Sequence, residues 1–131
     1  MKYLGIDYGS RKVGLAVGDG AIRVAVPLET WEGGADIVER VVAYVREEGI
    51  ETIVVGVAVP EGAQRREHYE RTLRFCDRLR AAVGVPVELV DEQFTSTEAR
   101  RVRHEAKIKV SEDALAAMIL LQAFFDEGRA I

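Results

Sequence analysis

Residues 2–19, KYLGIDYGSRKVGLAVGD, contain two apolar runs joined by a short turn. This pattern is typical of two antiparallel strands. The first run ends on Asp7, so a carboxylate stands at the exit of a buried strand, where it loses solvation unless a partner compensates. A divalent cation is one such partner, and a turn-capping hydrogen bond to the backbone is the other. Three glycines leave room for another backbone, such as that of a substrate, to approach closely: Gly5, Gly9 and Gly14.

The length and composition predict a single domain over residues 1–131. Hydrophobic residues make up 48% of the chain and charged residues 31%, which suits an ordinary core and a hydrated surface. The one cysteine, Cys76, excludes an internal disulfide and a thiolate zinc cluster, and its helical neighbours predict a core position. We find no signal-peptide pattern and no apolar run of membrane-spanning length, so we expect a cytoplasmic protein without a membrane partner.

Spacing of apolar residues predicts the element order βββ-α-β-α-β-α-α. The expected strands are residues 2–7, 13–18, 22–28, 52–57 and 85–90, with a turn at 18–20, and the expected helices are 35–48, 66–83, 95–106 and 113–127. Gly49 is placed to end the first helix and Ser111 to cap the last. Three antiparallel strands followed by alternating helices and strands predict an α/β fold, with a mixed five-stranded sheet and helices on both faces.

Acidic residues follow the predicted strand ends, where ligands of open α/β sheets gather. Asp91 and Glu92 follow the fifth strand, and Asp113 begins the last helix, before the small residues Ala114, Ala116 and Ala117. Carboxylates brought together with Asp7 would raise one another's pKa unless a cation neutralised them. Mg²⁺ or Mn²⁺ fits such oxygen ligands, and the pattern predicts phosphodiester hydrolysis by metal-activated water.

Each of these acids also has a purely structural interpretation. Asp113 would be favoured by the dipole of its helix, Asp91 could cap the following helix, and Glu92 could be a surface acid. Because successive strand residues face opposite ways, we expect Asp91 and Glu92 not to reach one metal together. Glu92, with the longer side chain, is the preferred ligand.

Basic residues cluster in two stretches, although the net charge of -4 argues against indiscriminate binding of polyanions. Residues 65–80 carry six arginines interleaved with glutamates and predict a solvated helix face. Residues 100–109 border the acidic segments and are the better candidate for phosphate contacts.

Three motifs resemble those of one family, in the same order and spacing. They are GIDYGSRKVGLAVGD at residues 5–19, DEQFTSTEA at 91–99 and DALAAMILLQ at 113–122. They resemble the motifs of the YqgF/RuvX proteins, RNase H-like nucleases named both as Holliday junction resolvases and as pre-16S rRNA nucleases. Two departures stand out: the fourth strand ends in GVAVPEG rather than G-L-P with a glycine-rich loop, and Gln93 replaces an arginine.

The resemblance implies an RNase H-like fold and a metal-dependent endonuclease. It assigns Asp7, Glu92 and Asp113 as metal ligands, with Asp91 the alternative for the second position. The expected phosphate contacts come from the turn after the first strand and from the predicted helix over residues 95–106. They are Arg11, Lys12, Thr95, Ser96, Arg100 and Arg101.

Structured RNA is the expected substrate, specifically the precursor of 16S rRNA at its 5′ end. The first alternative is a four-way DNA junction, whose two symmetric cuts would require a homodimer rather than a monomer. The second is a nucleic-acid-binding protein without catalysis on a nuclease fold.

Overall fold

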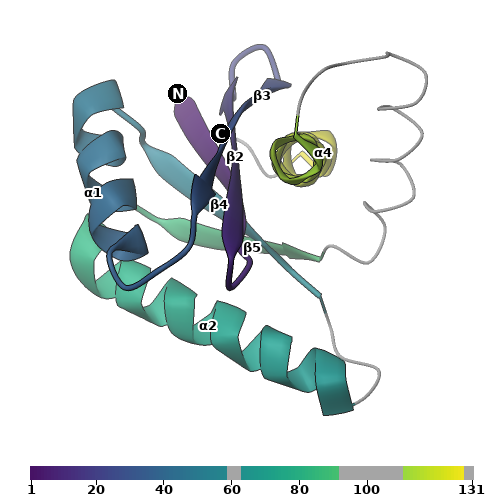
Figure 1. Cartoon of the computed structure of the whole chain (residues 1–131). Helices are drawn as coiled ribbons and strands as arrows, with labels where there is room; N and C mark the ends of the chain where they lie inside the picture. The colour runs from purple at the N-terminus through teal and green to yellow at the C-terminus, as the bar shows by residue number, and fades with distance from the viewer. Residues whose placement is uncertain (59–62, 92–110, 129–131) are drawn as a thin grey trace.

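Figure 1 shows the computed structural model, which describes residues 1–58, 63–91 and 111–128, with side chains described from residue 66 in the second of these ranges. The strands are β1 (Lys2–Asp7), β2 (Lys12–Asp19), β3 (Val24–Glu32), β4 (Thr52–Val57) and β5 (Val87–Asp91), and the helices are α1 (Ile37–Glu48), α2 (Ala63–Val83) and α4 (Glu112–Asp126). The predicted helix over residues 95–106 lies outside the described residues. None of the described helices has the length and apolar character needed to cross a membrane.

The strands form one mixed five-stranded sheet in the order β3-β2-β1-β4-β5. β1, β2 and β3 are an antiparallel meander, whereas β4 and β5 run parallel to β1. The predicted mixed sheet is therefore confirmed. Because β1, β4 and β5 point the same way, their carboxyl ends share one edge, which is where ligands of open α/β sheets bind.

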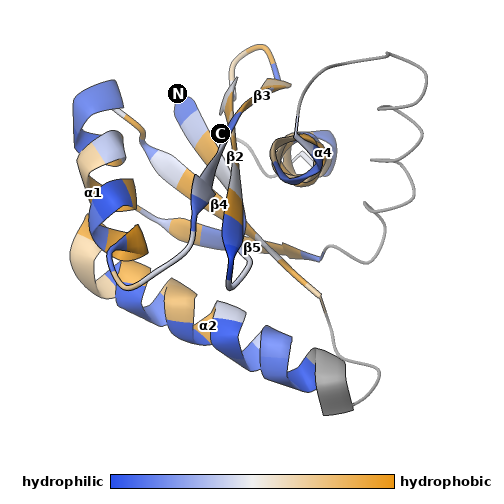
Figure 2. Cartoon of the chain, in the orientation of Figure 1, coloured by the Kyte–Doolittle hydropathy of each residue, from blue (hydrophilic) through white to orange (hydrophobic). Residues whose placement is uncertain are grey.

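Helices cover both faces of the sheet, as expected, with α1 and α2 on one face and α4 on the other (Figure 1). Alternate residues of β1 serve the two cores: Leu4 and Ile6 pack toward α1 and α2, whereas Tyr3 packs toward α4. There the Tyr3 ring meets Phe125 edge-on, with centroids 5.2 Å apart. Hydrophilic and hydrophobic residues intermingle along α1 and α2, in keeping with helices that bury one face (Figure 2).

The turn between β2 and β3 lies later than predicted. The sequence placed it at residues 18–20 and the third strand at 22–28, but β2 continues through Asp19 and the turn follows it. The Asp19 carboxylate accepts a hydrogen bond from the Ala21 N–H at 2.8 Å and lies 3.5 Å from the N-terminal ammonium. Asp19 thus starts the turn, which closes at Arg23 with a left-handed φ of 55°.

The predicted helix ends are confirmed. The Ser111 hydroxyl accepts a hydrogen bond from the Ala114 N–H at 3.1 Å, which satisfies one of the free donors of the first turn of α4. Gly49 ends α1 with a φ of 67°, in the left-handed region. Cys76 is fully buried between α2 and the sheet, as the helical pattern predicted.

Candidate active site

Asp7 is the last residue of β1, half-buried, and begins a row of three residues across the sheet. It pairs with Gly14 of β2, and Gly14 pairs with Thr30 of β3. Directly opposed residues of an antiparallel ladder face the same side of the sheet. The Asp7–Gly14–Thr30 row therefore faces α4, at the edge where β1 ends.

The first turn of α4 lies directly on Gly14. A Cβ atom built on Gly14 would overlap the main-chain carbonyl oxygen of Asp113 and would lie 2.9 Å from the Ala114 nitrogen. Only a glycine at this position lets the helix backbone approach so closely. The backbone of Asp113 is thereby brought beside the strand pair that ends in Asp7.

The remainder of α4 is seated on the same strands. Ala114 and Ala117 are fully buried, and a Cβ on Gly5 would lie 3.0 Å from the Ala117 carbonyl oxygen. The Gln122 carboxamide accepts a hydrogen bond from the Ala25 N–H at 3.0 Å and donates one to the Arg23 carbonyl. At Gly5 and Gly14 the closely approaching backbone is therefore that of α4, rather than that of a substrate.

Asp91 ends β5 but belongs to the other face of the sheet. Val90 packs in the core beneath α4, whereas Leu89 packs against the core beneath α1 and α2. Alternation along the strand therefore places Asp91, which pairs with Val57 of β4, on the α2 side. Strand alternation thus puts Asp91 and Asp7 on opposite faces of the sheet, and Glu92 lies outside the described residues.

A hollow of about 770 Å³ opens beside Asp113. Its lining joins the β1–β2 turn, the end of β3 and the start of α4: Gly9, Ser10, Arg11, Lys12, Glu32, Gly33 and Asp113. The Gly33 N–H donates a hydrogen bond to the Arg11 carbonyl at 2.8 Å, which ties the two loops together. Arg11 and Lys12, both exposed, thus lie at the mouth of the region that holds Asp113, where cations can meet a phosphate backbone.

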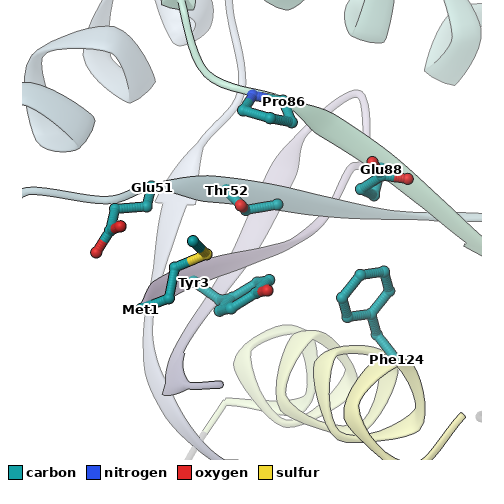
Figure 3. Close-up of a pocket in the computed structure, with 7 residues that line it drawn as sticks. All are labelled: Met1, Tyr3, Glu51, Thr52, Pro86, Glu88 and Phe124. Carbon is teal, nitrogen blue, oxygen red and sulfur yellow. The ribbon is translucent and has the colours of Figure 1, made fainter. Parts of the chain in front are cut away.

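A second hollow, of about 600 Å³, lies at the opposite end of the parallel strands (Figure 3). It is lined by Met1, Tyr3, Glu51, Thr52, Pro86, Glu88 and Phe124. Its position at the amino ends of β1, β4 and β5 is away from the edge where ligands of α/β sheets gather. We therefore assign the candidate site to the Asp7 edge.

Two of the basic residues of α2, Arg71 and Arg80, have structural partners. Arg71 pairs with Glu67 one turn earlier, at 2.5 Å, and Arg80 donates a hydrogen bond to the Val87 carbonyl at 2.8 Å. Such pairs on a solvated helix face stabilise the helix locally. Nothing at these residues points to a phosphate.

The residue types at the Asp7 edge suit a hard cation, because Asp7 at the strand end and Asp113 in the helix turn packed beside it both carry carboxylates. Within the part of the chain that the structure describes, no three His, Cys, Asp or Glu side chains form a metal-binding group. The predicted third ligand lies outside that part, as do four predicted phosphate contacts: Glu92, Thr95, Ser96, Arg100 and Arg101. Two features at the site were not predicted, Glu32 in the hollow and Thr30 in the row.

Comparison with known proteins supports the resemblance seen in the motifs. The family model RuvX, described as Holliday junction resolvase, matches residues 1–127. A relative from Chloroflexus aurantiacus, named "Putative pre-16S rRNA nuclease", is 34% identical over 97% of this chain and 88% of its own. A relative of the same name from Anaeromyxobacter is 37% identical over 99% of this chain and 100% of its own.

Solved structures show the same fold. Thermus thermophilus RuvC in complex with a Holliday junction substrate superposes with a TM-score of 0.66 at 20% identity, covering 98% of this chain and 96% of that chain. The fowlpox virus resolvase bound to Holliday junction DNA gives a TM-score of 0.64 at 9% identity, covering 97% and 98%. With the sheet order, the three motifs and the match over residues 1–127 in agreement, the chain belongs to the YqgF/RuvX family of nucleases and has an RNase H-like fold.

Proposed function

We propose that this protein is a divalent-metal-dependent endonuclease that acts on structured RNA, namely the precursor of 16S rRNA at its 5′ end, in the cytoplasm. The observation that carries the proposal is the seating of the first turn of α4 on Gly14, which brings Asp113 to the edge where β1 ends in Asp7. The names of the relatives from Chloroflexus and Anaeromyxobacter supply the substrate.

Asp7 and Asp113 would hold the metal, with Glu92 as the third ligand. Asp91 is the weaker candidate, because the alternation of β5 turns it to the α2 side. When bound, Mg²⁺ or Mn²⁺ would supply positive charge at the scissile phosphate and lower the pKa of a water molecule. Asp7 at a strand end and Asp113 at a helix start would hold that metal on packed elements of the fold.

The substrate backbone would lie across the hollow beside Asp113. Arg11 and Lys12 would contact phosphates there, and Thr95, Ser96, Arg100 and Arg101 are proposed to extend that contact. Such contacts orient the nucleic acid without reading its sequence. Specificity for one precursor would then come from the shape of the RNA.

The family description favours one other substrate, a four-way DNA junction. Resolving a junction needs two cuts related by symmetry, and hence a homodimer, whereas cleavage of one RNA strand needs only a monomer. The remaining hypothesis, binding without catalysis, predicts tight complexes with nucleic acid and no cleavage product.

One experiment separates these candidates. Wild-type protein is incubated with a pre-16S rRNA fragment, a linear DNA duplex and a four-way junction, each with Mg²⁺, with Mn²⁺ or with excess chelator. We expect cleavage of the RNA fragment alone, and only with a metal. Paired cuts in the junction with the RNA intact would assign the resolvase activity, and binding without any cleavage would overturn the nuclease proposal.

A further inference from the structure

Thr30 is tied to the start of α4 by a hydrogen bond. Its hydroxyl is bonded to the hydroxyl of Ser111, the N-cap residue of the helix. Ser111 in turn accepts the Ala114 N–H at 3.1 Å. Asp113 stands in the sequence between Ser111 and Ala114, so the chain of hydrogen bonds from Thr30 through Ser111 to Ala114 restrains the helical turn that carries it.

The first turn of α4 is thus fixed at two neighbouring places of the Asp7–Gly14–Thr30 row. At Gly14 the contact is steric: the absent side chain sets how closely the helix backbone approaches the sheet. A steric contact limits approach but leaves sliding and rotation of the turn open. The bond from Thr30 is directional, and it supplies the lateral restraint that the contact at Gly14 lacks.

We propose that Thr30 is a positioning residue, whose hydroxyl acts through Ser111 to set where Asp113 lies relative to Asp7 and thereby tunes the affinity for metal. The inference rests on the proposed function, because it presumes that Asp7 and Asp113 share a metal. Loss of a group bonded directly to a metal ligand changes metal affinity or activity by about 10–100-fold, and Thr30 acts one bond further out, so the lower end of that range is expected.

α4 also provides a matched control. Gln122 ties the far end of the same helix to the same strand, through the Ala25 N–H and the Arg23 carbonyl. It lies about two and a half turns from Asp113, where a lateral shift has little effect on the metal. If Thr30 only stabilised the fold, loss of either anchor would lower the Tm and affect metal binding equally. If Thr30 positions Asp113, only its loss should weaken metal binding.

The test uses three variants of the full chain. Thr30→Val removes the hydroxyl and keeps the branched shape that suits a strand, Thr30→Ser keeps the hydroxyl, and Gln122→Met removes the far anchor. For each we would measure Mn²⁺ binding by calorimetry, the Mn²⁺ concentration for half-maximal cleavage, the Tm and the hydrogen exchange rate of the Ala114 amide.

We expect Thr30→Val to raise both the Mn²⁺ dissociation constant and the half-maximal concentration by about 10-fold, with faster exchange at Ala114. Thr30→Ser should match the wild type, and Gln122→Met should lower the Tm and leave the metal response unchanged. A wild-type metal response in Thr30→Val, or an equal loss in Gln122→Met, would overturn the inference alone. A wild-type protein that binds no Mn²⁺ and cleaves nothing would overturn the proposed function with it.

Discussion

Gly14 and the carbonyl of Asp113 are in such close contact that no side chain fits between them. Gly14 is also the ladder partner of Asp7. The absence of a side chain at Gly14 therefore sets how closely α4, which carries Asp113, approaches the β1–β2 pair, which carries Asp7. The packing of the fold and the geometry of the candidate site depend on the same contact.

Gly14→Ala should consequently impair both stability and activity. The added methyl group meets backbone rather than a flexible side chain, so the helix must move, at a cost of about 1–3 kcal/mol in the free energy of unfolding. Gly49→Ala is the control, because its cost arises from a left-handed φ at a helix end with nothing within 4 Å. Urea unfolding and cleavage assays should show both variants destabilised but only Gly14→Ala catalytically impaired.

Asp7→Asn should abolish cleavage while the protein stays folded. The amide keeps the shape of the side chain but removes the anionic oxygen that a hard cation requires. Without metal, the Tm should hold or rise because repulsion among carboxylates is relieved. Thermal scans with and without Mn²⁺ should show a metal-induced rise in the wild type that the variant lacks. Normal cleavage by Asp7→Asn would remove the metal mechanism.

Alanine substitutions should separate Asp91 from Glu92. Asp91 lies on the α2 side of β5 by strand alternation, so we expect Asp91→Ala to retain most activity. Glu92→Ala should lose more than the roughly 10–100-fold that loss of an outer partner costs. Single-turnover cleavage rates decide the matter, and equal losses, or a larger loss for Asp91→Ala, would reverse the assignment.

Neutralising Arg100 and Arg101 together should weaken binding of all nucleic acids about equally. Each phosphate contact displaces condensed counterions, so the slope of log K against log salt should fall by about 1.4–1.8 in magnitude if both residues touch phosphates. The double change Arg74→Gln with Arg78→Gln, on exposed positions of α2, is the charge-matched control. A slope and an affinity identical to those of the wild type would leave residues 100–109 with no role in binding.

Cys76 should remain a protonated, unreactive thiol at neutral pH. Burial raises the pKa of Cys76 from 9.0 to about 11, against a smaller opposite effect of Arg80. The folded state therefore holds the proton more tightly than the unfolded state does, and its contribution to stability is full below pH 9 and declines as the pH rises toward 11. Unfolding curves across this range should show the decline in the wild type and a smaller one in Cys76→Ala.

The sequence predicted the features of the fold that depend on local chemistry. The Ser111 cap, the Gly49 helix end and the buried run of β4 follow from hydrogen-bonding groups and hydropathy a few residues apart. The β2–β3 turn was misplaced because Asp19 and its neighbouring glycines suit the interior of a turn equally well. The position of the turn is decided by the pairing of Asp19 with Lys2 and Val24, which depends on how the strands meet in the sheet and not on the local sequence.

The same distinction applies to the site. Asp7 and Asp113 were predicted, since one ends a strand and the other starts a helix at the edge where ligands gather. Thr30 could not be predicted, because its place beside Gly14 depends on the register of β3. An irregularity in the ladder between Leu15 and Ala16 shifts that register, and apolar spacing carries no signal for such a shift.

Calorimetric titration with Mn²⁺ would show whether Asp7 and Asp113 hold one divalent metal. Wild type, Asp7→Asn and Asp113→Asn would be compared with Asp126→Asn, which alters an acid at the far end of α4. We expect saturable binding by the wild type and Asp126→Asn, and at least about 10-fold weaker binding by the other two. Undiminished binding by both Asp7→Asn and Asp113→Asn would contradict a shared metal site.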